Sequence, residues 1–140
     1  MGYRRKSREL AMQALFYMDM LDNVSIEALD FFCRHFPPPK RAQPFFIKLT
    51  EGVINNRLEI DAIIERFSSN WKISRMSGVD RNILRIAVYE LLYCSEIPPK
   101  VSINEAIDVG KKFGTEDSGA FINGILDGIR RAKEKESISV

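Results

Sequence analysis

The residues of this chain that could carry out chemistry are few and scattered. His35 is the only histidine and has no cysteine or acidic pair at ligand spacing. Cys33 and Cys94 are far apart and form no CxxC motif, which argues against a zinc site or a disulfide framework. The sequence also lacks a glycine-rich phosphate loop. We therefore expect a protein that is not an enzyme and holds neither cofactor nor metal.

Charge is more informative, because it is concentrated at the N-terminus. Arg4, Arg5, Lys6 and Arg8 make half of the first eight residues basic, and none of those eight is acidic. The net charge of the whole chain is only +2. A basic cluster of this kind is typical of a segment that contacts phosphates. The alternative is a solvated, frayed terminus.

Apolar residues recur at three- and four-residue spacing along almost the whole chain, which predicts amphipathic helices. No segment gives a convincing strand pattern. The broadest apolar stripe, on the helix near 80–93, predicts a central helix covered by its neighbours. The apolar stripes run over residues 10–21, 26–36, 45–53, 58–67, 83–92, 106–113 and 121–129.

Start and stop signals divide these helices. Ser25 can cap the second helix, and the prolines at 37–39 end it. Pro44 suits the first turn of the third helix, which breaks at Asn55-Asn56. The segment 68–78 is predicted to be a loop, where we interpret Trp71 first as a packing residue and alternatively as a surface aromatic.

The last third of the chain carries the clearest local signals. Ser102 and Glu105 have the spacing of a capping box, which predicts a helix start at Ser102. Gly114 suits the left-handed position that ends this helix, and residues 115–118 open the last one. We predict one all-α domain over residues 1–140, with about six or seven helices, a basic arm at 1–8 and a charged tail at 131–140.

No apolar run reaches the roughly 20 residues of a membrane span, and the N-terminus lacks the core of a signal peptide. We expect a cytoplasmic protein with no membrane contact.

Four segments together resemble the NusB family of bacterial transcription antitermination factors. They are RRKSRELAMQALFYMD, GVINNRLEID, VDRNILRIAVYELLY and EIPPKVSINEAIDVGKKFGTEDSGAFINGILD. The resemblance implies two packed helical subdomains and binding of boxA RNA in nascent ribosomal transcripts. It also implies partnership with the ribosomal protein NusE, within an antitermination complex of other Nus factors on RNA polymerase.

The same resemblance assigns site residues. Arg4, Arg5, Lys6 and Arg8 would bind RNA phosphates, and Asp80 at the start of the central helix would face NusE. Asp80 could equally be a helix-start acid that interacts with the helix dipole. Further RNA-binding candidates, each with an alternative in capping or packing, are Tyr17, Asp117, Ser118, Phe121 and Asn123.

One departure from the family lies beside these residues. Gly119 and Ala120 stand where relatives often carry a basic residue just before the phenylalanine, which predicts weaker intrinsic RNA binding and more dependence on the partner. Two other functions stay open: a helical protein-binding adaptor without RNA recognition, and a detached domain of a ribosomal RNA cytosine methyltransferase. A homodimer through the same surface is a further possibility.

Overall fold

The computed structural model describes residues 2–69 and 71–135, and in that part of the chain every regular element is helical. A short 3-10 helix, η1 (Ile73–Arg75), precedes the central helix. The α-helices are α1 (Gly2–Met20), α2 (Ile26–His35), α3 (Gln43–Asn55), α4 (Arg57–Phe67), α5 (Gly78–Tyr93), α6 (Pro99–Phe113) and α7 (Ser118–Glu134). The prediction of an all-α fold is confirmed.

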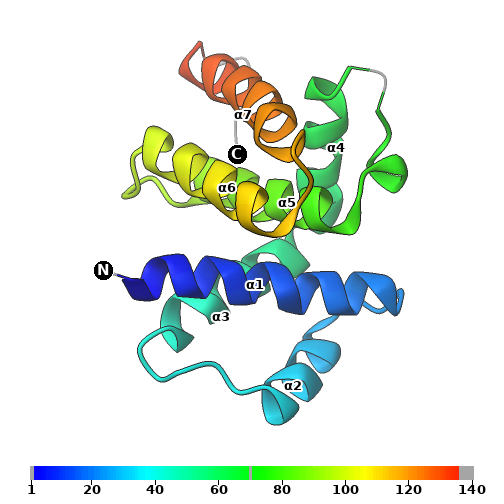
Figure 1. Cartoon of the computed structure of the whole chain (residues 1–140), viewed down its shortest axis with the longest axis vertical. Helices are drawn as coiled ribbons and strands as arrows, with labels where there is room; N and C mark the ends of the chain where they lie inside the picture. Colours follow the sequence, from blue (N-terminus) through cyan, green and yellow to red (C-terminus); the bar gives the residue numbers. More distant parts are fainter. Residues whose placement is uncertain (1, 70, 136–140) are drawn as a thin grey trace.

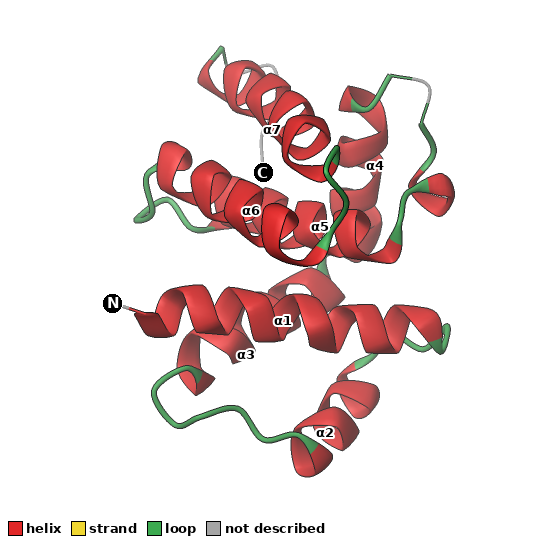
Figure 2. Cartoon of the chain, in the orientation of Figure 1, coloured by secondary structure: helices red, strands yellow, loops and turns green. Residues whose placement is uncertain are grey.

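The helices form two packed subdomains (Figure 1). Helices α1, α2 and α3 make the first, and α4 to α7 make the second, as the all-helical cartoon of Figure 2 also shows. Helix α5 joins the two, because it contacts α1 and α3 on one side and α4, α6 and α7 on the other.

The central position of α5 follows from its sequence. Ile83, Leu84, Ala87, Val88 and Leu91 are all buried and surround most of the helix. Full burial of one such large side chain stabilises a protein by roughly 1.5–3 kcal/mol. A helix that is apolar on so many sides must be covered on those sides, as the sequence predicted.

Several local predictions are confirmed. The Ser25 hydroxyl accepts a hydrogen bond from the amide of Ala28 at 3.0 Å and caps α2. Pro44 lies in the first turn of α3. The break at Asn55-Asn56 separates α3 from α4.

The predicted capping box is wrong. Helix α6 begins at Pro99, so Ser102 lies inside it, where its buried hydroxyl donates to Glu90 at 2.7 Å. The side chain of Glu105 points to α1 instead of to its own helix start. Gly114 has a φ of −97°, not a left-handed conformation. A glycine is required there because a Cβ atom would collide with the Ser118 side chain.

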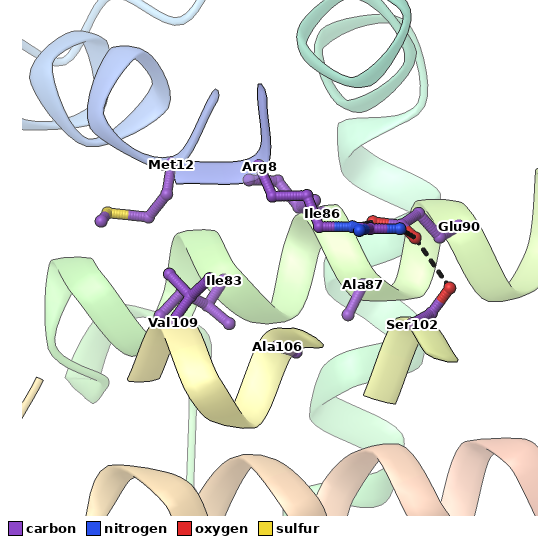
Figure 3. Close-up of a pocket in the computed structure, with 9 residues that line it drawn as sticks. All are labelled: Arg8, Met12, Ile83, Ile86, Ala87, Glu90, Ser102, Ala106 and Val109. Carbon is purple, nitrogen blue, oxygen red and sulfur yellow. Dashed lines mark hydrogen bonds and ion pairs between the residues drawn. The ribbon is translucent and has the colours of Figure 1, made fainter. Parts of the chain in front are cut away.

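A set of ion pairs, here called the clasp, fixes α1 against α5 and α6. Arg8 donates to both carboxylate oxygens of Glu90 at 2.8 Å (Figure 3). Glu105 accepts from Arg8 at 3.2 Å and from two nitrogens of Arg5 at 2.7 and 2.6 Å. Asp108 accepts a further bond from Arg5 at 2.9 Å. Only a small cavity of about 10 Å³ remains beside Arg8 and Glu90.

A second network of ion pairs is centred on Arg85 of α5. Its guanidinium donates to both oxygens of Asp61, at 2.8 and 3.0 Å, and so fastens α5 to α4. Asp19 at the end of α1 accepts from Arg85 at 3.2 Å and from Arg81 at 2.7 Å. Both networks therefore use charged residues of α5 to hold neighbouring helices.

The predicted terminal segments need correction. Helix α1 begins at Gly2, so the basic residues lie on its first turns and not on a separate arm. Helix α7 continues to Glu134, so residues 131–134 of the predicted charged tail are helical. Residues 136–140 of that tail lie outside the described residues. No described helix is long and apolar enough to cross a membrane.

The clasp predicts a large stability effect at Arg8. Replacing Arg8 by Ala leaves the Glu90 carboxylate buried without its cation, which costs about 3–5 kcal/mol. Unfolding in urea measures the loss. The exposed Lys6 of the same turn is the control, and Lys6→Ala is expected to change the free energy by less than about 0.5 kcal/mol. Equal effects of the two changes would contradict the buried role of Arg8.

The clasp also predicts a pH dependence at Glu105. Hydrogen bonds from Arg5 lower the pKa of Glu105 below its ordinary value of 4.5, against the opposing effect of burial. A lowered folded-state pKa contributes stability above the unfolded-state pKa, and that stability is lost as the pH falls through the folded-state pKa. Glu105→Gln should therefore flatten the decline of unfolding free energy below about pH 5.

The control for this pH measurement is Glu51→Gln, at an exposed position of α3. Urea unfolding across the acid range should show an unchanged slope for this variant. A Glu105→Gln protein with the wild-type pH profile would refute the prediction.

Candidate nucleic-acid interface

The basic residues of α1 divide into free and engaged cations. Arg4 and Lys6 are exposed, and the Arg4 guanidinium lies 4.8 Å from the centre of the Phe45 ring. Arg5 is partly exposed, but its Nε and Nη2 atoms already bind Glu105 and Asp108. Of these basic residues of α1, Arg4 and Lys6 are therefore the exposed ones without a salt bridge among the described residues, and the most available to a phosphate.

Arg8 does not fit the role that the sequence gave it. Its side chain is 5% exposed, and its guanidinium binds Glu90 and Glu105. A phosphate could reach it only by breaking a buried ion pair. Arg8 positions α1 and is removed from the set of phosphate contacts.

The start of α7 is built by Ser118, whose side chain is buried. Its hydroxyl accepts a hydrogen bond from the amide of Thr115 at 2.9 Å and so closes the α6–α7 turn. Ser118 therefore holds the start of α7 in place, and its buried side chain cannot contact RNA. Asp117, one residue earlier, is exposed and makes no side-chain cap hydrogen bond.

A surface hollow of about 330 Å³ lies where η1, the start of α5 and the start of α7 meet. We call it the α5–α7 hollow. Trp71 and Phe121 form an aromatic corner in it, with ring centres 6.1 Å apart and planes at 69°. Trp71 is 53% exposed, and Phe121 is partly buried. The lining residues are Trp71, Arg75, Met76, Ser77, Asp80, Asp117 and Phe121.

The hollow brings together residues that the sequence assigned to two different ligands. Asp117 and Phe121, one helical turn apart, were predicted to bind RNA, and Asp80 was predicted to face a protein. The Asp80 Oδ1 atom is buried and has no hydrogen-bond partner among the described residues. The amide of Asp80 donates to the Ser77 hydroxyl at 3.0 Å, so Ser77 is the cap of α5.

Asn123 and Tyr17 lie outside the hollow. Residues two positions apart in an α-helix differ by about 200° around its axis. Asn123 is therefore exposed on the side of α7 away from Phe121. Tyr17 is 37% exposed and its ring centre lies 5.7 Å from that of Phe32, on the α1–α2 surface. The structure therefore assembles Asp80, Asp117 and Phe121, but does not add Asn123 or Tyr17 to them.

Two residues of the hollow were missed or undervalued from the sequence. Trp71 is exposed and its ring also lies against that of Phe121, so the alternative interpretation as a surface aromatic was undervalued. Arg75 lines the same hollow but was not singled out. Both residues lie in the connection between α4 and α5, which was the signal that the sequence offered, since connecting segments carry binding residues more often than buried elements do.

The charge and shape of the surface suggest that the hollow and the basic start of α1 suit different parts of a nucleic acid. Asp80 and Asp117 outnumber Arg75 in the hollow, which disfavours a phosphate there and leaves the aromatic corner for a flat base. The free cations of α1 suit phosphates. Gly78 of α5 packs against Phe16, and Phe16 lies ten residues, about 15 Å, beyond Lys6 along α1. A ligand that meets both regions must be extended.

Comparison with known proteins shows the family of this chain. The family model described as "NusB family" matches residues 5–131. The transcription antitermination protein NusB of Desulfatibacillum aliphaticivorans is 60% identical over 136 residues, covering 97% of this chain and 95% of that protein. The protein of the same name from Desulforapulum autotrophicum is 53% identical and covers 95% and 94%.

Solved structures give the same result. NusB of T. maritima superposes with a TM-score of 0.82 at 37% identity, covering 96% of this chain and 97% of that one. A chain from a crystal structure of the antitermination factors NusB and NusE in complex with dsRNA gives a TM-score of 0.82 at 30% identity, covering 94% and 98%. The chain that carries the clasp and the α5–α7 hollow therefore belongs to the NusB family.

Proposed function

We propose that this protein is a non-catalytic transcription antitermination factor that binds boxA RNA of nascent ribosomal transcripts together with NusE. The observation that carries the proposal is the match, over 94% of the chain, to a structure of NusB with NusE and dsRNA. The proposed complex also includes RNA polymerase and other Nus factors. Binding of nascent transcripts would place the protein in the bacterial cytoplasm.

The described surface supports specific roles. Arg4 and Lys6 are the proposed phosphate contacts. Arg5 contributes when a phosphate displaces one of the carboxylates that bind it. Trp71 and Phe121 are proposed to stack a base at the rim of the hollow, as aromatic side chains do with single-stranded RNA. Asp117 borders that base, and Asn123 and Tyr17 extend the surface to either side. Asp80 is proposed to meet NusE where the hollow opens.

The alternatives have less support. The relatives reported above align over nearly their whole length and are named antitermination proteins, which favours that role over a detached methyltransferase domain. An adaptor without RNA recognition would bind NusE but show no preference for boxA. A homodimer through the same surface would compete with RNA and make its binding depend on protein concentration.

The first prediction concerns the free cations. Binding of labelled boxA RNA and of a scrambled RNA, with and without NusE, is measured across salt concentrations. The double change Arg4→Ala/Lys6→Ala should weaken boxA binding, because two phosphates lose their cations. Each lost contact should reduce the slope of log affinity against log salt by about 0.7.

The matched control is Arg34→Ala/Lys40→Ala, which removes the same charge at exposed positions near the end of α2. It should leave the salt slope unchanged. Binding of NusE without any preference for boxA over the scrambled RNA would replace the antitermination proposal by the adaptor.

The second prediction concerns the departure beside Phe121. Ala120 is exposed and the next residue is Phe121, so Ala120→Lys places a cation at the rim of the base site. We expect tighter boxA binding at low salt and a slope steeper by about 0.7. Ala62→Lys, at an exposed position of α4, is the control and should have little effect. No difference between the two variants would count against the α7 start as part of the RNA surface.

A further inference from the structure

We propose that Asp108 is an intramolecular competitor for RNA phosphate at Arg5 and thereby limits the affinity of this chain for RNA. The inference rests on the proposed RNA-binding function and deepens it. It assigns a role in RNA affinity to a residue of α6 that lies outside the predicted site.

The geometry around Arg5 is that of a guanidinium already occupied by anions. Glu105 binds its Nε and Nη2 atoms side by side, at 2.7 and 2.6 Å. Asp108 binds the same Nη2 atom at 2.9 Å. A phosphate that takes the place of Asp108 can accept from Nη2 and also from Nη1, which takes no part in these bonds, while Glu105 keeps its bond to Nε.

The two carboxylates differ in how firmly they are held. The Glu105 side chain is 22% exposed and also accepts from the buried Arg8, so it belongs to the clasp. The Asp108 side chain is 49% exposed, and its contact with Arg5 is a surface ion pair. Exposed pairs of this kind contribute little to stability. Asp108 is therefore the anion that a phosphate can displace.

Charge counting shows why this matters for RNA. The guanidiniums of Arg5 and Arg8 face three carboxylates, those of Glu90, Glu105 and Asp108. The clasp is thus net negative by one charge beside the free cations Arg4 and Lys6. Neutralising Asp108 removes the repulsion of a nearby phosphate and replaces the carboxylate at Nη2 by a neutral amide oxygen, which is a weaker competitor. The carboxylate keeps weak, non-specific phosphate contacts from forming at Arg5.

The test compares Asp108→Asn with a matched control, Glu134→Gln. Glu134 is also an exposed carboxylate that binds an arginine, Arg130, at 2.8 Å, and its change alters the net charge equally. Asp108→Asn should tighten the binding of boxA RNA about fivefold at low salt, the effect of one unit charge a few ångströms away in water. Screening should shrink this gain at physiological ionic strength, where the Debye length is about 8 Å. Glu134→Gln should leave the affinity unchanged.

The same change in an Arg5→Gln background shows whether Arg5 carries the effect. There Asp108→Asn should improve RNA binding far less, while thermal unfolding confirms that each variant is folded. Equal gains for Asp108→Asn and Glu134→Gln, or an undiminished gain without Arg5, would overturn the proposal. The scrambled RNA should gain at least as much as boxA, because a phosphate contact carries no sequence information.

Failure of the function itself would look different. A wild-type protein that binds no RNA at any salt concentration, with or without NusE, would refute the proposed function and this inference together. A wild-type protein that prefers boxA while Asp108→Asn leaves its affinity unaltered would refute the inference alone.

Discussion

The arrangement of the helices depends on one buried carboxylate, that of Glu90 on α5. It is almost completely removed from water and accepts hydrogen bonds from Arg8 of α1 and Ser102 of α6. A buried charge without a partner is strongly destabilising, so α1 and α6 must both approach α5 at this point. The apolar surface of α5 supplies the general attraction between helices, and Glu90 fixes which turn of α1 meets which turn of α6.

This constraint divides the basic N-terminus into two functional parts. Arg8 is taken up by the core, and Arg5 is held at its edge by Glu105 and Asp108. Arg4, whose guanidinium lies over the Phe45 ring, and Lys6 are both exposed and keep their charge available. One short run of similar residues thus both anchors the helix and supplies phosphate contacts, depending on the direction in which each side chain leaves α1.

In the α5–α7 hollow, too, some residues stabilise the fold and others are available to a ligand. Ser118 and Ser77 organise the two helix starts, and the exposed Trp71 and the partly buried Phe121 lie against each other beside them. Its acidic residues disfavour phosphate there, while the cations at the start of α1 attract it elsewhere on the surface. An extended strand that places phosphates at one end and a base at the other fits this separation.

The sequence by itself determined the class of fold, most helix boundaries and the family, because helical periodicity, prolines and caps act over a few residues. Ser25, Pro44 and the break at Asn55-Asn56 are examples, and the central place of α5 followed from its broad apolar stripe. The sequence could not show that Ser102 and Glu105 serve α5 and α1 instead of capping their own helix, since a capping box and a pair of tertiary contacts use the same residue types. Only the tertiary structure decided which N-terminal cations are free and which are paired. The reason is that Glu105, which pairs with Arg5 and Arg8, lies about a hundred residues away from them in the chain.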